Sequence, residues 1–350
     1  MTDDNSTGSL LEKERQYLKW KKAVVHIEPA RSSKSYTEMK KIHEEVVNDL
    51  ESGHLTQEEA QKRMHESISR DVRFQGTAIF LHHNSLRYLV TARHVVHDEK
   101  SHISDYLDVL PGDDHAAKEY RERLLAYDNE YAEKAIFNMI FLVPSLDDAL
   151  RGINPGIRDF LMNLGAGPYD LGPYVFSSPT VDLAVISLDQ RDSSFADSLM
   201  SRGYRPVALA DIADGPASET GDVFSVGYPG SVSVIGKRMN DPAMADWSSN
   251  SFSLPVFSYG RVSMTHDKLP FFWCDLSCYP GSSGSPIIEN GKLIGVVSEQ
   301  AGQPEPILNE SGGQGEARYS LTRIPFAKAT KGKFVRDLLL EQEKKTRMKF

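Results

Sequence analysis

Three serines lie close together in the segment 278–298, CYPGSSGSPIIENGKLIGVVS: Ser282, Ser283 and Ser285. A serine hydroxyl is a weak nucleophile at neutral pH, so it needs a base that accepts its proton and a group that orients this base. It also needs N–H donors for the oxyanion that develops on the substrate. Chemistry at any of these serines therefore requires partners from elsewhere in the chain.

Two other short segments carry side chains of the types that a reactive serine needs. VTARHVV places His94 where the chain leaves an apolar strand, and VDLAVISL places Asp182 at the start of another apolar strand. In PGSSGSP, Ser283 lies between Gly281 and Gly284 in a predicted tight turn whose N–H groups converge. An imidazole base, an orienting carboxylate and a serine in a glycine turn are the parts of a nucleophilic serine site.

Other motifs favour simpler interpretations. GSSGS is not a G-x-S-x-G nucleophile elbow, because Ser285 occupies the position of the second glycine. GSVSVIGK, at 230–237, has one residue too many for a P-loop and lacks a Ser or Thr after its lysine. The pairs His82-His83 and His94/His97 have no acidic or cysteine partner at ligand spacing, which favours solvated histidines over a metal site.

Many short strands must position these residues. Apolar, β-branched segments separated by turns, without regular alternation of strand and helix, predict an antiparallel barrel or sandwich. Asn290-Gly291 is suited to a type I′ hairpin turn between two such segments. The predicted strands are AVVHIE, two strands within 74–96, FNMIFLV, TVDLAVISL, GDVFSVGYPG, VFSYGRVSM, FFWCDLS, SPIIEN, KLIGVVSE and YSLTRI.

Helices are predicted at both ends and in two inserts. A helix at 36–52 has Gly53 as its stop, and a second begins at Thr56 with Glu59 completing a capping box. The predicted organisation is a helical leader at 1–22, a central β domain at 23–325 with helical inserts at about 30–70 and 99–176, and a C-terminal helix at 326–350.

Composition and charge restrict the class of protein. Apolar residues make up 40% and charged residues 25%, and the net charge of −9 argues against a nucleic-acid binder. We expect no secretory signal and no membrane helix, because the first residues are polar and acidic and no apolar run reaches about 18 residues. The two cysteines, Cys274 and Cys278, are too far apart on one extended strand to pair, so we expect a cytoplasmic, disulfide-free chain.

TARHVV, DLAVISL and PGSSGSP resemble the three active-site blocks of the chymotrypsin-like (trypsin-fold) serine peptidases, in the same order along the chain. YPGSSGSP and the turn GYPG are most similar to the bacterial Deg or high-temperature-requirement type, and Asp275 matches an aspartate of that type. The resemblance covers residues 74–98 and 178–300. It implies a mainly β, chymotrypsin-like double antiparallel β-barrel, with the predicted helices as insertions and terminal additions.

The resemblance also implies a role for each residue. Ser283 would be the nucleophile, His94 the general base and acid, and Asp182 the group that fixes the imidazole tautomer. The N–H groups of Gly281 and Ser283 would form the oxyanion hole, and no metal or organic cofactor is implied. The residues that would wall the primary specificity pocket are Ser277, Cys278 and Tyr279 on one side and Val297, Ser298 and Glu299 on the other.

This pocket and its loop depart from those of the animal digestive enzymes. Ser277 rather than a carboxylate matches the base of the pocket, so we expect small or apolar side chains before the cut and poor acceptance of Lys and Arg. Ser282 replaces the aspartate that pairs with a newly cut N-terminus in those enzymes, so we expect no activating cleavage. Ser285 replaces the usual glycine, and we expect no PDZ domain after the barrel.

These patterns predict a cytoplasmic serine endopeptidase of bacterial type that acts on protein or peptide substrates through an acyl-enzyme. The helical inserts or terminal helices would dock a regulatory protein partner, and neither nucleic acid nor a membrane is expected as a partner. The alternative is a catalytically silent scaffold that keeps the barrel and binds peptides. A fluorophosphonate probe distinguishes the two, because it labels only an activated serine.

Overall fold

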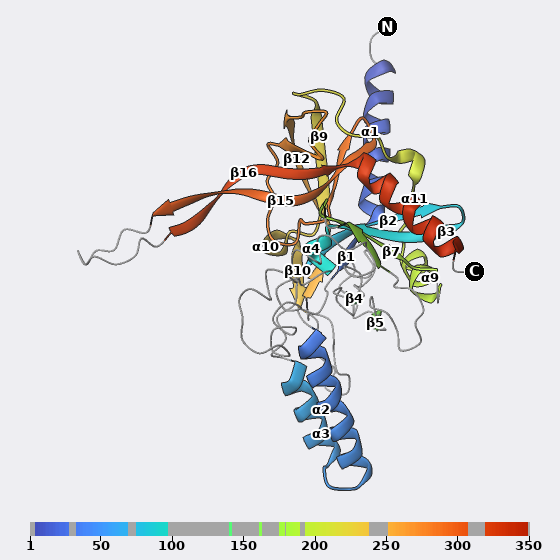
Figure 1. Cartoon of the computed structure of the whole chain (residues 1–350), viewed down its shortest axis with the longest axis vertical. Coiled ribbons are helices and arrows are strands. Elements are labelled where there is room, and N and C mark those ends of the chain that lie inside the picture. The colour runs from blue at the N-terminus through green and yellow to red at the C-terminus, as the bar shows by residue number, and fades with distance from the viewer. Residues whose placement is uncertain are drawn as a thin grey trace, which may run out of the picture.

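The computed structural model describes residues 4–27, 33–68, 75–96, 140–141, 161–162, 175–178, 180–189, 193–237, 251–306 and 319–348. Two β units form the body of the molecule, and helices lie at its ends (Figure 1). The predicted helical insert at 99–176 lies outside the described residues, apart from the paired strands β4 (Ile140–Phe141) and β5 (Leu161–Met162) and the start of β6.

The first β unit is a six-stranded sheet in the order β1-β2-β3-β7-β6, with β8 pairing in parallel with β2. All five residues of β7 are buried, and alternate side chains enter two different core clusters. Burial on both faces explains why its first four residues, LAVI, are continuously apolar. The strands are β1 (Val24–Ile27), β2 (Gly76–His83), β3 (Leu86–Thr91), β6 (Val175–Ser178), β7 (Leu183–Ser187) and β8 (Val207–Ala208).

The second β unit is a closed antiparallel barrel in the order β12-β13-β16-β15-β14-β9. β15 and β16 continue beyond the barrel as a long two-stranded ribbon (Figure 1). Asn290 and Gly291, with φ of 50° and 77°, form the turn between β14 and β15, as a type I′ hairpin requires. The strands are β9 (Asp222–Gly227), β12 (Val256–Met264), β13 (Phe271–Cys274), β14 (Pro286–Glu289), β15 (Lys292–Pro306) and β16 (Tyr319–Lys331). The predicted mainly β fold is confirmed.

One core cluster joins the two β units. It combines Val90 and Val185 of the first sheet with Val226 and Val296 of the barrel. Because these side chains pack together, the two units hold a fixed relative position. Residues at their junction can therefore be placed precisely.

Terminal helices close this shared core. Helix α1 (Asp4–Ala23) buries Trp20 completely, and the indole donates a 3.2 Å hydrogen bond to Gly291 O. Helix α11 (Gly332–Met348) packs Val335, Leu338 and Leu339 into the same cluster. The helix predicted at 326–350 thus begins only at Gly332, because the preceding residues continue β16.

Two further helices, α2 (Ser33–Glu51) and α3 (Gln57–Ile68), form a hairpin that projects from the β units (Figure 1). Thr56 and Glu59 form the predicted capping box, in which Thr56 N donates to Glu59 Oε2 at 2.9 Å and Glu59 N donates to Thr56 Oγ1 at 3.3 Å.

No helix within the described ranges is long and apolar enough to cross a membrane. The shorter elements are α4 (Arg93–Val96), α9 (Ser194–Ser201), η2 (Leu209–Asp211), α10 (Gly230–Ser233), β10 (Val234–Lys237) and β11 (Ser251–Ser253).

Candidate active site

Strand pairing in the first sheet brings His94 and Asp182 together. Thr91 at the end of β3 pairs with Ala184 near the start of β7, so the residues just beyond these strand ends are neighbours. His94 Nδ1 lies 2.6 Å from Asp182 Oδ2, and the His94 backbone N–H donates to Asp182 Oδ1 at 2.9 Å. One carboxylate thus holds both the imidazole ring and its backbone.

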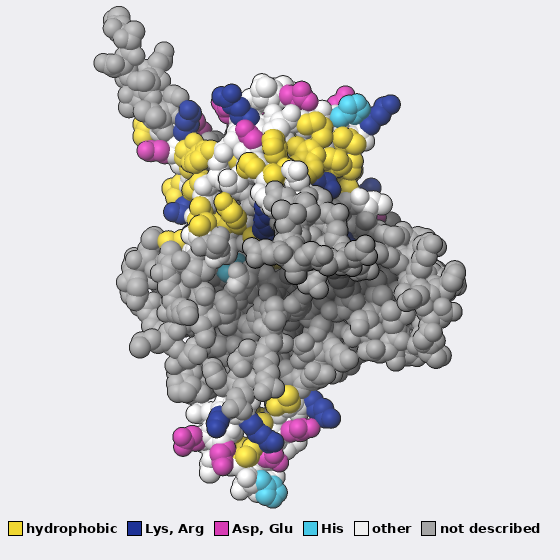
Figure 2. Space-filling view, turned by 90° about the vertical axis from the view of Figure 1, so that its left-hand side faces the viewer, with side chains coloured by type: hydrophobic (Ala, Val, Ile, Leu, Met, Phe, Trp, Pro, Cys, Tyr) yellow, Lys and Arg dark blue, Asp and Glu magenta, His cyan; other side chains and the backbone are white. Residues whose placement is uncertain are grey.

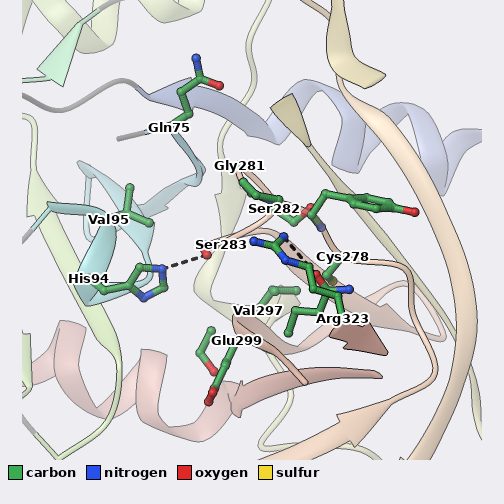
Figure 3. A pocket seen from close by; sticks show the side chains of 14 residues that line it. Gln75, His94, Val95, Cys278, Gly281, Ser282, Ser283, Val297, Glu299 and Arg323 are labelled. Atoms are coloured by element: carbon green, nitrogen blue, oxygen red, sulfur yellow. Dashed lines mark hydrogen bonds between the residues drawn. The ribbon is translucent and has the colours of Figure 1, made fainter. Parts of the chain in front are cut away.

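The barrel contributes the serine. Ser283 lies in the turn between β13 and β14, and its Oγ lies 2.9 Å from His94 Nε2 (Figure 3). Thr77 on β2 donates its N–H to Ser283 O at 2.9 Å, which ties this turn to the first sheet. Asp182, His94 and Ser283 therefore form a continuous hydrogen-bond chain across the junction of the two β units.

The neighbouring serines have different surroundings. Ser282 is buried, and its Oγ accepts the N–H of Tyr279 at 3.2 Å. Ser285 is also buried, and its hydroxyl has no hydrogen-bond partner among the described residues. Of the three serines in the motif, Ser283 is therefore the one that the structure places against an imidazole.

The environment of His94 favours its protonated form. Burial lowers the pKa of the imidazole, but the hydrogen bond to Asp182 and the charges of Asp182 and Glu299 outweigh this effect. The pKa of His94 is consequently raised above its ordinary value. A raised pKa makes the imidazole a stronger base, and this helps it to accept the proton of a serine hydroxyl.

Two peptide groups beside Ser283 are held in place by hydrogen bonds to their carbonyl oxygens. Gly230 N donates to Pro280 O at 2.8 Å, and Ser285 N donates to Ser282 O at 2.9 Å. In a trans peptide the N–H points opposite to the carbonyl, so the N–H groups of Gly281 and Ser283 face away from these anchors. Neither N–H donates to a protein acceptor within the described part of the chain. Both remain available to an oxyanion.

Gly281 has the conformation that this loop needs. Its φ is +98°, which favours glycine, and a Cβ at this position would lie 2.3 Å from Tyr228 O. Its carbonyl accepts the Thr77 hydroxyl at 2.9 Å, and the same hydroxyl accepts the N–H of Tyr228 at 2.9 Å. The loop is therefore held by Thr77 of the first sheet as well as by its own turn.

A cleft of about 460 Å³ opens beside Ser283. Five of the six residues predicted for the specificity pocket line it: Cys278, Tyr279, Val297, Ser298 and Glu299. Ser277 does not. It is exposed, and its carbonyl accepts the hydroxyl of Ser258 at 3.2 Å, because this part of the chain lies against β12. The predicted base of the pocket is thus not part of the cleft wall.

The cleft also contains residues that the sequence did not reveal: Gln75, Gln300 and Arg323. Arg323 belongs to β16, which pairs with the wall strand β15. Its segment, YSLTRI, was predicted as a strand, but no motif linked it to the serine. Only the pairing of β15 with β16 brings Arg323 to the cleft, and no local sequence pattern predicts that pairing.

A closed antiparallel barrel beside a second antiparallel sheet, with a Ser–His–Asp chain at their junction, defines the class of trypsin-fold serine peptidases. The model of the trypsin-like peptidase domain matches residues 76–296, more than half of the 350-residue chain. The chain belongs to this family, which supports serine peptidase activity. A search of curated proteins found no match.

Proposed function

We propose that the protein is a serine endopeptidase that hydrolyses peptide bonds through an acyl-enzyme intermediate. The observation that carries this proposal is the hydrogen-bond chain from Asp182 through His94 to Ser283, with distances of 2.6 and 2.9 Å. Both distances lie within hydrogen-bond reach, and the second places His94 Nε2 where it can take the proton of the Ser283 hydroxyl.

Each side chain has a defined step in this reaction. His94 Nε2 accepts the Ser283 proton as Oγ attacks the scissile carbonyl carbon, and the carbonyl π electrons move to oxygen. The N–H groups of Gly281 and Ser283 stabilise that oxyanion. His94 then donates the proton to the leaving amine, while Asp182 accepts from Nδ1–H and holds the tautomer. Water then attacks the acyl-enzyme through the same proton transfers at His94, and the carboxylic acid product leaves Ser283.

The shape of the cleft supports an endopeptidase. Val297 and Ser298 of β15 form one wall, and an extended substrate chain can lie along such a strand. The substrate is therefore a protein or peptide chain. Within the family we propose a Deg-type enzyme of bacterial origin acting in the cytoplasm, and this rests on the motif YPGSSGSP and the two unpaired cysteines.

The α2–α3 hairpin supports a regulatory role for a protein partner. Ile42 and Val47 are exposed on α2, with 37% and 41% of their surface accessible. Figure 2 shows this hairpin at the bottom of the molecule, with hydrophobic, acidic and basic side chains together on its surface. We propose that a protein docked here restrains or activates the cleft.

The direct test compares turnover of a denatured protein substrate by four variants. Ser283→Ala and His94→Ala should each lower kcat by about 10⁶-fold. Asp182→Asn should lower it by about 10⁴-fold, because the imidazole tautomer is no longer held.

Ser282→Ala is the matched control and should retain most activity, because Ser282 bonds only within its own turn. If Ser282→Ala abolishes turnover while Ser283→Ala does not, the nucleophile has been wrongly assigned. A catalytically silent scaffold would show no turnover by the unsubstituted protein.

A further inference from the structure

We propose that the cleft selects an acidic side chain, glutamate or aspartate, on the N-terminal side of the scissile bond, and that Arg323 makes this selection. The inference rests on the proposed function, since it names the substrate of the same site. It replaces the sequence-based expectation of small or apolar side chains, which was made without Arg323.

The position of Arg323 is the first observation. It lines the cleft together with Ser283 and with Cys278 and Val297 of the predicted pocket walls. In Figure 3 its side chain extends into the cleft from the side opposite His94, with the guanidinium directed toward Ser283. A side chain that precedes the cut and enters the space between these walls would meet the guanidinium.

The bonding of Arg323 is the second observation. Its Nη1 donates to Gln300 Oε1 at 3.3 Å, and this acceptor is a neutral amide. Among the described residues no carboxylate forms an ion pair with Arg323. A guanidinium offers five N–H donors in a planar fork that matches the two oxygens of a carboxylate. Most of this fork is therefore free to bind an acidic side chain.

The remaining charges in the cleft do not cancel that of Arg323. Glu299 also lines the cleft, but Lys328 Nζ donates to its Oε2 at 3.1 Å, so this pair is neutral overall. The thiol of Cys278 is neutral as well, because burial raises its pKa to about 12. Together Arg323, Glu299 and Lys328 carry one net positive charge, which attracts a substrate carboxylate and repels Lys or Arg.

The test uses four peptidyl diphenyl phosphonates that are identical except for Glu, Gln, Leu or Lys at the position before the phosphorus. The Ser283 hydroxyl attacks phosphorus and phenol leaves, so the labelling rate reports the pocket without requiring turnover. The Glu reagent should label the full chain about tenfold or more faster than the isosteric Gln reagent, because a charged hydrogen bond is worth more than a neutral one.

Arg323→Ala should remove the difference between the Glu and Gln reagents by slowing labelling with the Glu reagent, and the labelling that remains shows that Ser283 is still activated. Arg323→Glu should reverse the preference in favour of Lys. Arg261→Glu is the matched control: it changes the net charge equally, but Arg261 lies on β12, where it bonds Asp222 and does not line the cleft. This variant should keep the preference for Glu.

Three outcomes would overturn the inference: fastest labelling by the Leu or Lys reagent, a preference for Glu that survives Arg323→Ala, or an equal loss of preference in Arg261→Glu. If the protein is not a serine peptidase, the result is different. In that case no reagent labels the protein, or Ser283→Ala is labelled as fast as the unsubstituted chain.

Discussion

At Ser283, reactivity depends on the protonation state of one imidazole. Only neutral His94 can accept the serine proton, and its pKa lies above the ordinary value because Asp182 and Glu299 favour the charged ring. As the pH falls through this raised pKa, the fraction of competent enzyme falls. Activity should therefore be lost at acidic pH and should rise through a midpoint above about 6.5, the usual value for histidine.

Glu299 provides a test of this explanation. Glu299→Gln removes a negative charge that raises the pKa of His94, so the acidic limb of the kcat/KM profile should move to lower pH. Glu12→Gln is the control, because Glu12 is exposed on α1 and its side chain bonds Gln16. An unchanged midpoint for Glu299→Gln, or a shift to higher pH, would contradict the assignment.

The motif residues could be predicted from the sequence, whereas Arg323 could not. His94, Asp182 and Ser283 each lie in a short segment whose local pattern identifies it, and in the structure their side chains lie within hydrogen-bond distance of one another. Arg323 has no such local pattern. Its place in the cleft follows from the pairing of β16 with β15, which is a nonlocal property of the barrel.

At the scale of elements, β2 of the first sheet controls the loop of the second unit. The buried Thr77 hydroxyl donates to Gly281 O and accepts from Tyr228 N, both at 2.9 Å. Thr91 Oγ1 in turn donates to Thr77 O at 2.7 Å. Thr77 is therefore a positioning residue, since it acts on the reacting groups only through the backbone of Gly281 and Ser283.

Thr77→Val should disturb this loop without changing the shape of the side chain. It removes the donor to Gly281 and leaves the Tyr228 N–H without its acceptor, so we expect kcat to fall by about 10- to 100-fold with little change in KM. The free energy of unfolding should fall by about 1–3 kcal/mol. Steady-state kinetics and denaturant unfolding measure these effects.

Thr77→Ser keeps the hydroxyl and should restore most of kcat. A merely structural role for Thr77 would give a different pattern, in which stability falls while kcat per folded molecule stays the same. That result would show that the hydroxyl does not position the oxyanion loop.

The barrel strands and their hairpin turn followed from local sequence, but their exact extents and the short strands β5, β6, β8, β10 and β11 did not. The Asn290-Gly291 hairpin was predicted because a type I′ turn needs positive φ at both residues. The C-terminal helix begins at Gly332 rather than 326, because pairing with β13 and β15 extends β16 to Lys331. The family resemblance matches Ser277 to the base of the pocket, but this part of the chain lies against β12 and Ser277 does not line the cleft.

At the scale of the whole molecule, the oxyanion loop is held without a buried salt bridge to any residue that the structure describes. Ser282 N donates to Tyr279 O at 2.8 Å, and Ser285 N donates to Ser282 O at 2.9 Å. These backbone hydrogen bonds close the turn locally. The loop therefore has no need of an α-amino group released by cleavage, and the chain should be competent with its N-terminal helix in place.

The packing of α1 supports the same expectation. A cut before Ala23 would remove the buried Trp20, and Tyr17 would no longer pack edge-on against Phe224 at a centroid distance of 4.9 Å. Loss of a buried tryptophan typically costs about 3–5 kcal/mol of stability. Such a cut should destabilise the protein rather than activate it.

The most direct measurement is mass spectrometry of the chain after reaction with a fluorophosphonate. We predict one adduct, on Ser283, in chains that still carry α1, with equal labelling of Ser282→Ala and none of Ser283→Ala. Labelling only of chains cut before Ala23 would contradict the expected competence of the uncut protein. An adduct on another serine, or no adduct at all, would contradict the central claim that Ser283 is an activated nucleophile.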